Sequence, residues 1–321
     1  MTLPPLVWYI VRRLAALALL LLLLSFGIFS LLYVAPGDIV QSLLGTRQAS
    51  PQLIAQLRSQ YNLDEPFLTQ YWIWLKSAVH LDLGDSTITG LPVTKSIQQH
   101  YGVTLFLGLF AFAITSIVGV ALGIASAVRK RGLVDRGIVG SSVVGVSTPA
   151  FVTGIVLLYL FAVRLPWFPA FGPGSGFTDR LEHLTLPAFA LALTQTALVL
   201  KLTRASMIEA LDQDYVAFAR ARGAPVRQVI FTYAFRNALI PVVTASSLIL
   251  AYLLTGAVLV EVTFALPGLG SLLVDAVSQK DVPMVQGLAL VVAATVMFAN
   301  LITDVLYVFL DPRIRFERGA A

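Results

Sequence analysis

Long apolar runs dominate the chain and predict helices that cross a membrane. The hydrocarbon core of a bilayer is about 30 Å thick, which needs about 20 apolar residues in an α-helix. Six stretches are long enough, and polar segments separate them. The pattern therefore predicts an all-α polytopic membrane protein with six transmembrane helices, at about residues 14–34, 103–128, 138–163, 185–202, 239–259 and 287–310.

The first apolar run begins after Arg12 and Arg13, as the apolar region of a signal peptide would. It is longer than such a region, and residues 34–38 offer no small-x-small cleavage site. We therefore expect this segment to be retained as a membrane anchor.

Composition supports a membrane protein over a soluble one. Apolar residues make up 57% of the chain and charged residues 12%, against about 25% charged in an ordinary soluble domain. The net charge of +5 is typical of basic cytoplasmic loops in a membrane protein. A soluble enzyme and a disordered scaffold are excluded, and no nucleic-acid partner is expected. The chain has no cysteine, which excludes disulfides and thiolate chemistry.

The basic residues divide unevenly between alternate loops. Fifteen of the 22 Lys and Arg residues fall in the set of loops that contains both termini. Cytoplasmic loops carry the excess of Lys and Arg in membrane proteins. We therefore expect both termini to be cytoplasmic.

A long segment after the first span indicates a separate structural unit. A helix is expected from Pro51, where proline suits the first helical turn. The aromatic residues Tyr71, Trp72 and Trp74 are typical of a helix at the bilayer surface. We expect an N-terminal segment with the first transmembrane helix at 1–34, an extracytoplasmic subdomain with short helices at 35–102, and a transmembrane core at 103–321.

The loop at residues 203–238 has a clear local pattern. Tyr215, Phe218 and Ala219 fall at helical spacing, and Gly223 stands where left-handed backbone would end a helix. The proline two residues later can open a second short helix. Two short amphipathic helices are expected, either as a connector on the membrane surface or as a docking platform for another protein.

The motifs of soluble catalysis are missing from the sequence. No glycine-rich run ends in Gly-Lys followed by Ser or Thr, so this chain is not expected to hydrolyse ATP. His80, His100 and His183 stand apart, without the spacing of zinc ligands, and no metal site is expected.

Two acidic residues in or beside the spans need an explanation. Asp304 lies inside the sixth span, where a charge is costly, and a basic packing partner is favoured over a coupling-ion site. Glu261 lies at the outer mouth of the fifth span and is expected to act as a gate or hinge contact.

Small residues and a proline indicate how the helices pack. Gly119 and Gly123 form a Gly-x-x-x-Gly step, which predicts close contact with another helix. Pro149 is expected to kink the third span, either as a structural feature or as part of a conduit.

Several short motifs follow one another along nearly the whole chain. They are Pro36-Gly37-Asp38, Asp82-Leu83-Gly84-Asp85-Ser86, Asp214-Tyr215, Ala219-Arg220-Ala221-Arg222-Gly223, Arg236-Asn237, Glu261 with Phe264, Pro267-Gly268-Leu269-Gly270, Asp281 with Pro283, and Asp304 followed by Asp311-Pro312-Arg313. In this order they resemble the ATP-binding-cassette (ABC) importer permeases of the dipeptide, oligopeptide and nickel branch, in particular the subunit with the long first outer loop. The chain departs from the usual pattern at Arg222, where lysine is common, and at Tyr233, where histidine is common.

The resemblance implies a type I ABC importer permease fold in the bacterial inner membrane. It implies a transmembrane permease subunit of an ATP-driven importer, working by alternating access on di- or oligopeptides. Nickel, glutathione and oligosaccharides are the alternative substrates. The implied partners are a second homologous permease, two cytoplasmic ATPase subunits of one or two kinds, an extracytoplasmic substrate-binding protein and the lipid bilayer. ATP and Mg would be bound by the ATPase subunits, and no cofactor by this chain.

The resemblance also assigns roles to residues. Gly223 would reverse the backbone, Tyr215 and Ala219 would fill an apolar groove of the ATPase, and nearby arginines would pair with its acidic rim. The expected coupling residues are Asp214, Tyr215, Ala219, Arg220, Ala221, Arg222, Gly223, Arg236 and Asn237. The residues expected at the outer gate or in contact with the binding protein are Glu261, Phe264, Pro267, Gly268, Gly270 and Asp281.

Two functions of other classes are the alternatives. A self-sufficient secondary carrier or channel would transport solute without ATP in proteoliposomes. A membrane-embedded hydrolase would need a nucleophile with a base or a metal, which the sequence does not assemble. Co-purification with ATPase subunits and nucleotide-dependent uptake distinguish these possibilities.

Overall fold

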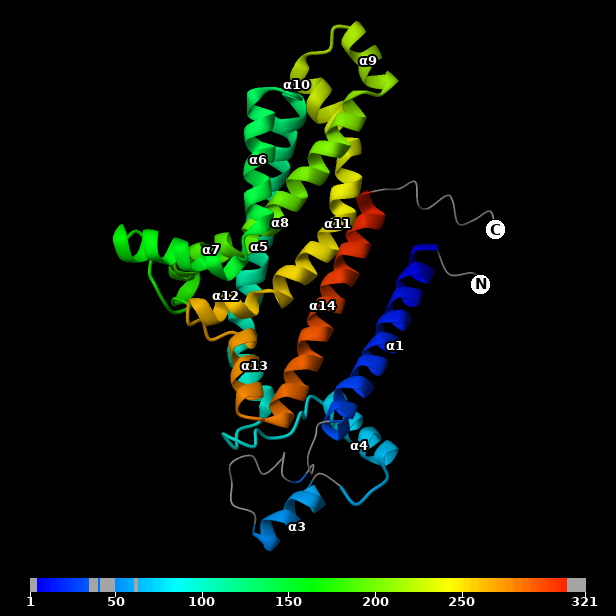
Figure 1. The fold of residues 1–321 in the computed structure, drawn as a ribbon. Helices are drawn as coiled ribbons and strands as arrows, with labels where there is room; N and C mark the ends of the chain where they lie inside the picture. Colours follow the sequence, from blue (N-terminus) through cyan, green and yellow to red (C-terminus); the bar gives the residue numbers. More distant parts are fainter. Residues whose placement is uncertain (1–4, 35–39, 41–49, 61–62, 311–321) are drawn as a thin grey trace.

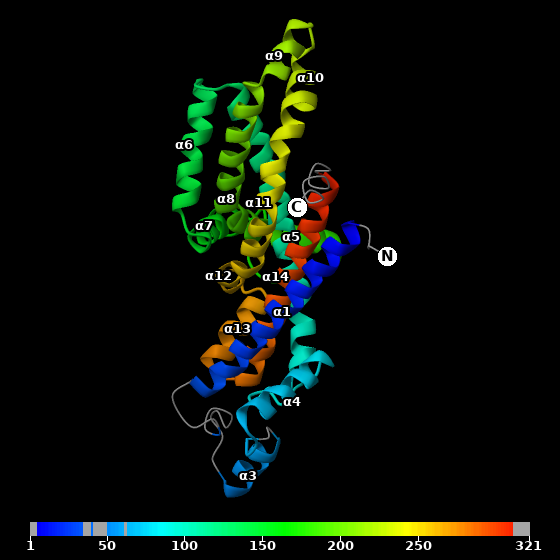
Figure 2. The ribbon, with the colours of Figure 1, turned by 90° about the vertical axis from the view of Figure 1, so that its right-hand side faces the viewer.

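The computed structural model describes residues 5–34, 40, 50–60 and 63–310 (Figure 1). Within them the chain is helical, and an isolated antiparallel bridge between Asp85 and Pro92 is the one strand-like pairing. The helices form an elongated bundle, with α9 (Asp214–Ala221) at one tip and α3 (Pro51–Gln60) at the opposite end (Figures 1 and 2). The predicted all-α class is confirmed.

Five helical segments of the described chain are long and apolar enough to cross a membrane, and a bent pair makes a sixth if it is counted as one span. The predicted spans are therefore present, mostly as longer helices. They are α1 (Pro5–Val34), α5 (Val93–Val128), α8 (Gly176–Leu211), α14 (Val282–Leu310), and a run that contains α10 (Val226–Gln228), η2 (Val229–Ala234), α11 (Phe235–Thr255) and α12 (Ala257–Thr263).

The third predicted span is not one helix. It consists of α6 (Leu133–Ser147) and α7 (Ala150–Leu157), which continues as the π-helical η1 (Leu158–Arg164), with a bend of 103° between the two parts. Thr148 is extended, with φ −97° and ψ 121°, because the residue before a proline avoids helical backbone. Pro149 therefore breaks the span rather than merely kinking it.

The predicted loop at 203–238 is also mostly helical. Its first residues belong to α8, which continues to Leu211. Pro225 does open a helix, but α10 runs on through the π-helical η2 into α11. The expected pair of short helices is therefore one short helix, α9, and the beginning of a long one.

The core of the bundle is the contact of α5 with α8 and α11. A Cβ atom at Gly119 would lie 2.8 Å from Cβ of Val199, and one at Gly123 would lie 2.5 Å from Cβ of Thr203. Side chains do not approach so closely, so glycine at these two positions lets α5 and α8 touch. Leu107 of α5 and Leu191 of α8 are fully buried in the same core.

The short helix α4 (Phe67–Val79) packs against α1 through aromatic side chains. Tyr71 is buried and its hydroxyl lies 2.8 Å from Oγ of Ser25. Its ring also meets the rings of Phe26 and Phe29. Tyr71 therefore faces α1, whereas Trp72 is 65% exposed, and the position of this helix at the bilayer surface stays a prediction.

Candidate functional site

The tip formed by α9 is a reversal of the backbone outside the main bundle (Figure 2). Gly223 has a φ of +79°, a left-handed conformation that glycine adopts without a steric penalty. The N–H of Gly223 donates to the carbonyl of Arg220 at 2.9 Å, and the N–H of Ala224 donates to that of Ala219 at 3.1 Å. These bonds end α9 and turn the chain towards α10.

The two faces of α9 differ in their surroundings. Val216 and Ala219 are buried, whereas Phe218 is 71% exposed and Tyr215 is 39% exposed. The expectation that Ala219 fills a groove of another protein is wrong, because that face packs on its own chain. Phe218 presents the larger apolar surface. Its helical spacing from Tyr215 already indicated in the sequence that both residues share one face of the helix.

The remaining predicted coupling residues surround this face. Exposed positions at the tip are Asp214, Arg220, Ala221, Arg222, Gly223 and Arg236. Asn237 has a different place: its Nδ2 donates to the hydroxyl of Tyr215 at 2.9 Å and to the carbonyl of Tyr233 at 3.1 Å. Asn237 therefore links α9 to the helix that follows it.

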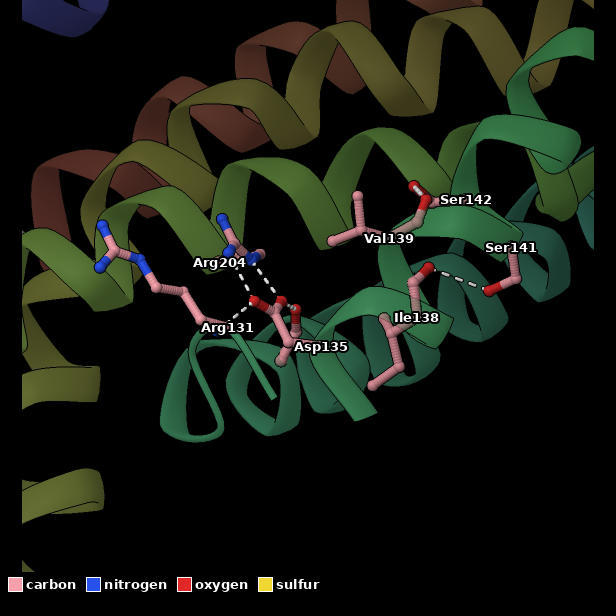
Figure 3. Close-up of polar contacts among 8 residues, drawn as sticks. Arg131, Asp135, Ile138, Val139, Ser141, Ser142 and Arg204 are labelled. Carbon is pink, nitrogen blue, oxygen red and sulfur yellow. Dashed lines mark hydrogen bonds and ion pairs between the residues drawn. The ribbon is translucent and has the colours of Figure 1, made fainter. Parts of the chain in front are cut away.

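A buried carboxylate joins three elements near the tip (Figure 3). Asp135, in the first turn of α6, is 4% exposed. It accepts two hydrogen bonds from Arg204 of α8, from Nε at 2.7 Å and from Nη2 at 2.8 Å. It also accepts from the N–H of Arg131 at 2.8 Å and from the hydroxyl of Ser126 at the end of α5. The sequence analysis did not single out Asp135, although acidic residues are favoured in a first helical turn.

A second carboxylate, that of Glu261, lies at the opposite end of the core and is fully buried. It accepts from the hydroxyl of Thr104 at 2.6 Å and from the N–H groups of Gly270 at 2.8 Å and Ser271 at 3.0 Å. These two N–H groups belong to the first turn of α13 (Leu269–Ser278), where carboxylates are stabilising. Glu261 therefore anchors the start of α13.

The neighbouring motif residues complete this anchor. A Cβ atom at Gly268 would lie 2.3 Å from the carboxyl carbon of Glu261. Phe264 is 1% exposed, and Gly270 is buried as well. Burial leaves Glu261, Phe264, Gly268 and Gly270 without surface for direct contact with another protein, whereas Pro267 is exposed. The alternative of an outer gate stays a prediction for these residues.

Asp281 caps the start of α14 and ties it to residues 86–87. It is 3% exposed and receives hydrogen bonds from the N–H of Thr87 at 3.2 Å and from the hydroxyl of Ser86. The N–H of Met284, in the first turn of α14, lies 3.4 Å away. Asp281 is thus also unavailable to another protein. The open face of α13 carries Val274 and Val277, which are 39% and 58% exposed.

Asp304 forms an ion pair with a basic residue of another helix. Its carboxylate lies 2.5 Å from Nη2 of Arg13, which joins α14 to α1. Elsewhere in the described ranges, no three His, Asp or Glu side chains gather as a metal site would require.

Comparison with known proteins assigns the family. Residues 119–316 match the family described as "binding-protein-dependent transport system inner membrane component", and residues 6–107 match its N-terminal counterpart. A putative peptide transport system permease protein of Brucella abortus is 38% identical over 96% of this chain and 99% of its own length. The di/tripeptide transport system permease protein DppB of Pseudomonas aeruginosa is 36% identical over 97% and 99%. A probable peptide ABC transporter permease protein of Sinorhizobium fredii is 35% identical over 96% and 99%. The chain therefore belongs to the family of inner membrane components of binding-protein-dependent transport systems, with the type I ABC permease fold.

Proposed function

We propose that this chain is a transmembrane permease subunit of an ATP-driven importer of di- or oligopeptides. The similarity to relatives named as peptide and di/tripeptide permeases extends over nearly the full chain. The observation that carries the proposal is the exposed α9 tip, where an aromatic ring and two arginines surround a backbone reversal.

The complete transporter contains other subunits. A second homologous permease shares the translocation pathway, and two ATPase subunits, of one or two kinds, bind ATP and Mg. A substrate-binding protein delivers the peptide on the opposite side of the membrane. The complex lies in the inner membrane of a bacterium.

The distribution of basic residues orients the chain in that membrane. The tip carries Arg220, Arg222 and Arg227, and the nearby α5–α6 turn carries Arg129 and Lys130. An excess of Lys and Arg favours the cytoplasmic side. The α9 end therefore faces the cytoplasm, and so do the first residues of α1 and the last residues of α14 (Figure 1).

The tip couples ATP hydrolysis to transport. Phe218 and Tyr215 enter an apolar groove of the ATPase, and Arg220 and Arg222 pair with acidic residues at its rim. α9 is held between the ends of α8 and α11, so closure of the ATPase subunits moves both helices. That movement alternates access to the pathway.

The opposite end receives the binding protein. Because Glu261 and Asp281 are buried, docking uses the surface that they hold in place, which includes the α13 face with Val274 and Val277. This face and the segment that contains α4 together form the extracytoplasmic surface.

Pull-down of the assembled complex tests the proposal. Phe218→Asp is expected to lose the ATPase subunits, because a carboxylate then enters the apolar contact. Val277→Asp is the matched control, since Val277 is exposed on α13 at the other end. Retention of the ATPase by Phe218→Asp, or peptide uptake by this chain without any ATPase, contradicts the proposal.

A further inference from the structure

We propose that the Asp135–Arg204 ion pair is the joint that transmits movement of the α9 tip into α6, and through α6 into α7. This inference rests on the proposed coupling function of the tip and assigns a positioning role to two residues outside it.

The position of Arg204 places the joint close to the moving part. Arg204 lies seven residues before Leu211, where α8 ends, which is about 10 Å along a helix. Two residues connect the end of α8 to the start of α9 at Asp214. Any displacement of the tip therefore reaches the guanidinium of Arg204 through a short, regular segment.

α6 has few other attachments at this end. In the first turn of α6 Asp135 is buried, whereas Leu133 is 86% exposed and Val134 is 42% exposed. Near the other end of α6, the hydroxyl of Thr194 donates to the carbonyl of Gly145 at 3.4 Å, and a Cβ atom at Gly145 would meet Leu193 at an ordinary 3.5 Å. An exposed ion pair, Lys130–Asp212, also joins the α5–α6 turn to the residue after α8, but Asp135–Arg204 is the buried one and the one that reaches α6 itself.

The geometry of the pair suits transmission. Nε and Nη2 of Arg204 bind different oxygens of Asp135, so the two planar groups fix orientation as well as distance. The same carboxylate receives the N–H of Arg131 and the hydroxyl of Ser126, which tie it to the α5–α6 turn. A pull on Arg204 thus moves the whole turn together with α6 (Figure 3).

α6 leads on to α7, which lies near the middle of the bundle (Figure 1). Beyond the 103° bend, α7 packs against α12, where a Cβ atom at Gly154 would lie 3.0 Å from the ring of Phe264. Phe264 is one turn from Glu261, which anchors α13. The α6–α7 arm therefore connects the tip with the support of α13.

Spin labels on the complete complex in nanodiscs test the joint. The chain has no cysteine, so labelled pairs can be introduced into it without background. One pair is Val144→Cys on α6 with Leu248→Cys on α11, and the other is Leu198→Cys on α8 with Leu248→Cys; all three positions are at least half exposed. ATP with vanadate is expected to change both distances in the otherwise unaltered chain.

Arg204→Gln removes the pair but leaves Asp135 bonded to the α5–α6 turn. The α6–α11 distance change is expected to fall at least twofold, while the α8–α11 change persists, and ATP hydrolysed per peptide imported is expected to rise at least threefold. Arg204→Lys keeps the positive charge but cannot form the bidentate contact, and it is expected to give distance changes between those of the other two chains. It replaces Arg204→Gln in the test if that variant does not fold. Lys130→Gln, which breaks the exposed Lys130–Asp212 pair at 3.2 Å, is the control and should change neither distance.

The outcomes separate the joint from the function on which it rests. An unchanged α6–α11 response in Arg204→Gln, or in Arg204→Lys where only that variant folds, overturns the joint and leaves the proposed function intact. Absence of any nucleotide response in both pairs of the otherwise unaltered complex overturns the proposed function itself.

Discussion

The α9 tip and the α13 end both carry motif residues, but only the tip exposes most of them. Arg220, Arg222 and Gly223 lie on the surface, whereas Glu261 and Asp281 are buried behind α13. The difference teaches that a motif locates a working region without saying which of its residues touch a partner. At the tip the motif residues are exposed and form the docking surface that we propose, whereas at the α13 end they are buried and support the residues that are exposed.

The two buried carboxylates show the same contrast. Asp135 meets a guanidinium from another helix, while the donors around Glu261 are a hydroxyl and two backbone N–H groups. A carboxylate bound by N–H groups caps a helix. Asp135 also receives an N–H and a hydroxyl, but its bidentate arginine joins α6 to α8 as well. Substitutions at the α13 end should therefore reduce stability, and substitutions at the tip should reduce coupling.

The largest effect is expected for Glu261→Ala. Three donors lose their acceptor, two of them buried, at about 1–3 kcal/mol for each buried one, so the free energy of unfolding should fall by about 3 kcal/mol or more. Denaturant unfolding of the purified permease in detergent measures the change. Glu182→Ala, at an exposed position of α8, is the control, and similar losses in both variants would contradict the buried-anchor interpretation.

Gly268→Ala should have the next largest effect. Its new Cβ atom would lie 2.3 Å from the carboxyl carbon of Glu261, and overpacking of this kind costs about 1–3 kcal/mol. The same unfolding measurement applies. Gly140→Ala, where a Cβ atom would meet nothing within 4 Å, should cost less; the reverse order would show that α13 is free to shift.

Gly223→Val tests the tip. Valine in left-handed backbone costs about 1–2 kcal/mol locally, because its Cβ crowds the following carbonyl. The free energy of unfolding should fall by about that amount, and peptide uptake by the reconstituted transporter should fall at least tenfold, while the complex still assembles. Normal uptake in this variant would refute a coupling role for the reversal.

Arg222→Glu should have the smallest effect on stability, within about 0.5 kcal/mol, because its side chain is exposed. Its effect on assembly should be larger, since the reversed charge faces the acidic rim of the ATPase. Titration of ATPase subunits onto the permease measures this, with Arg164→Glu, exposed at the other side of the bundle, as the control. Equal binding by both variants would count against the proposed docking face.

Local patterns predicted much of this architecture. Apolar length located the spans, and the glycine after α9 located the reversal, because each depends on neighbouring residues. The Gly119–Gly123 step likewise marks a close contact, although the sequence did not say that α8 is its partner.

Contacts between distant segments were beyond such patterns. Asp135 and Arg204 are 69 residues apart, and Glu261 meets Thr104 across 157 residues. Glu261 is buried because α13 folds back against it. Helical periodicity describes one helix at a time and cannot predict such a contact. The position of Ala219 was mistaken for the same reason: spacing defined its face, but not what that face meets.

The break at Pro149 has a consequence for the surrounding lipid. α6 has 15 residues, about 22 Å of helix, which is shorter than the roughly 30 Å of hydrocarbon. Hydrophobic mismatch of this size is relieved by local thinning or by neighbouring protein. We therefore expect α7, which runs at 103° to α6, to cover the end of this short helix, and the bilayer beside it to be locally thinner.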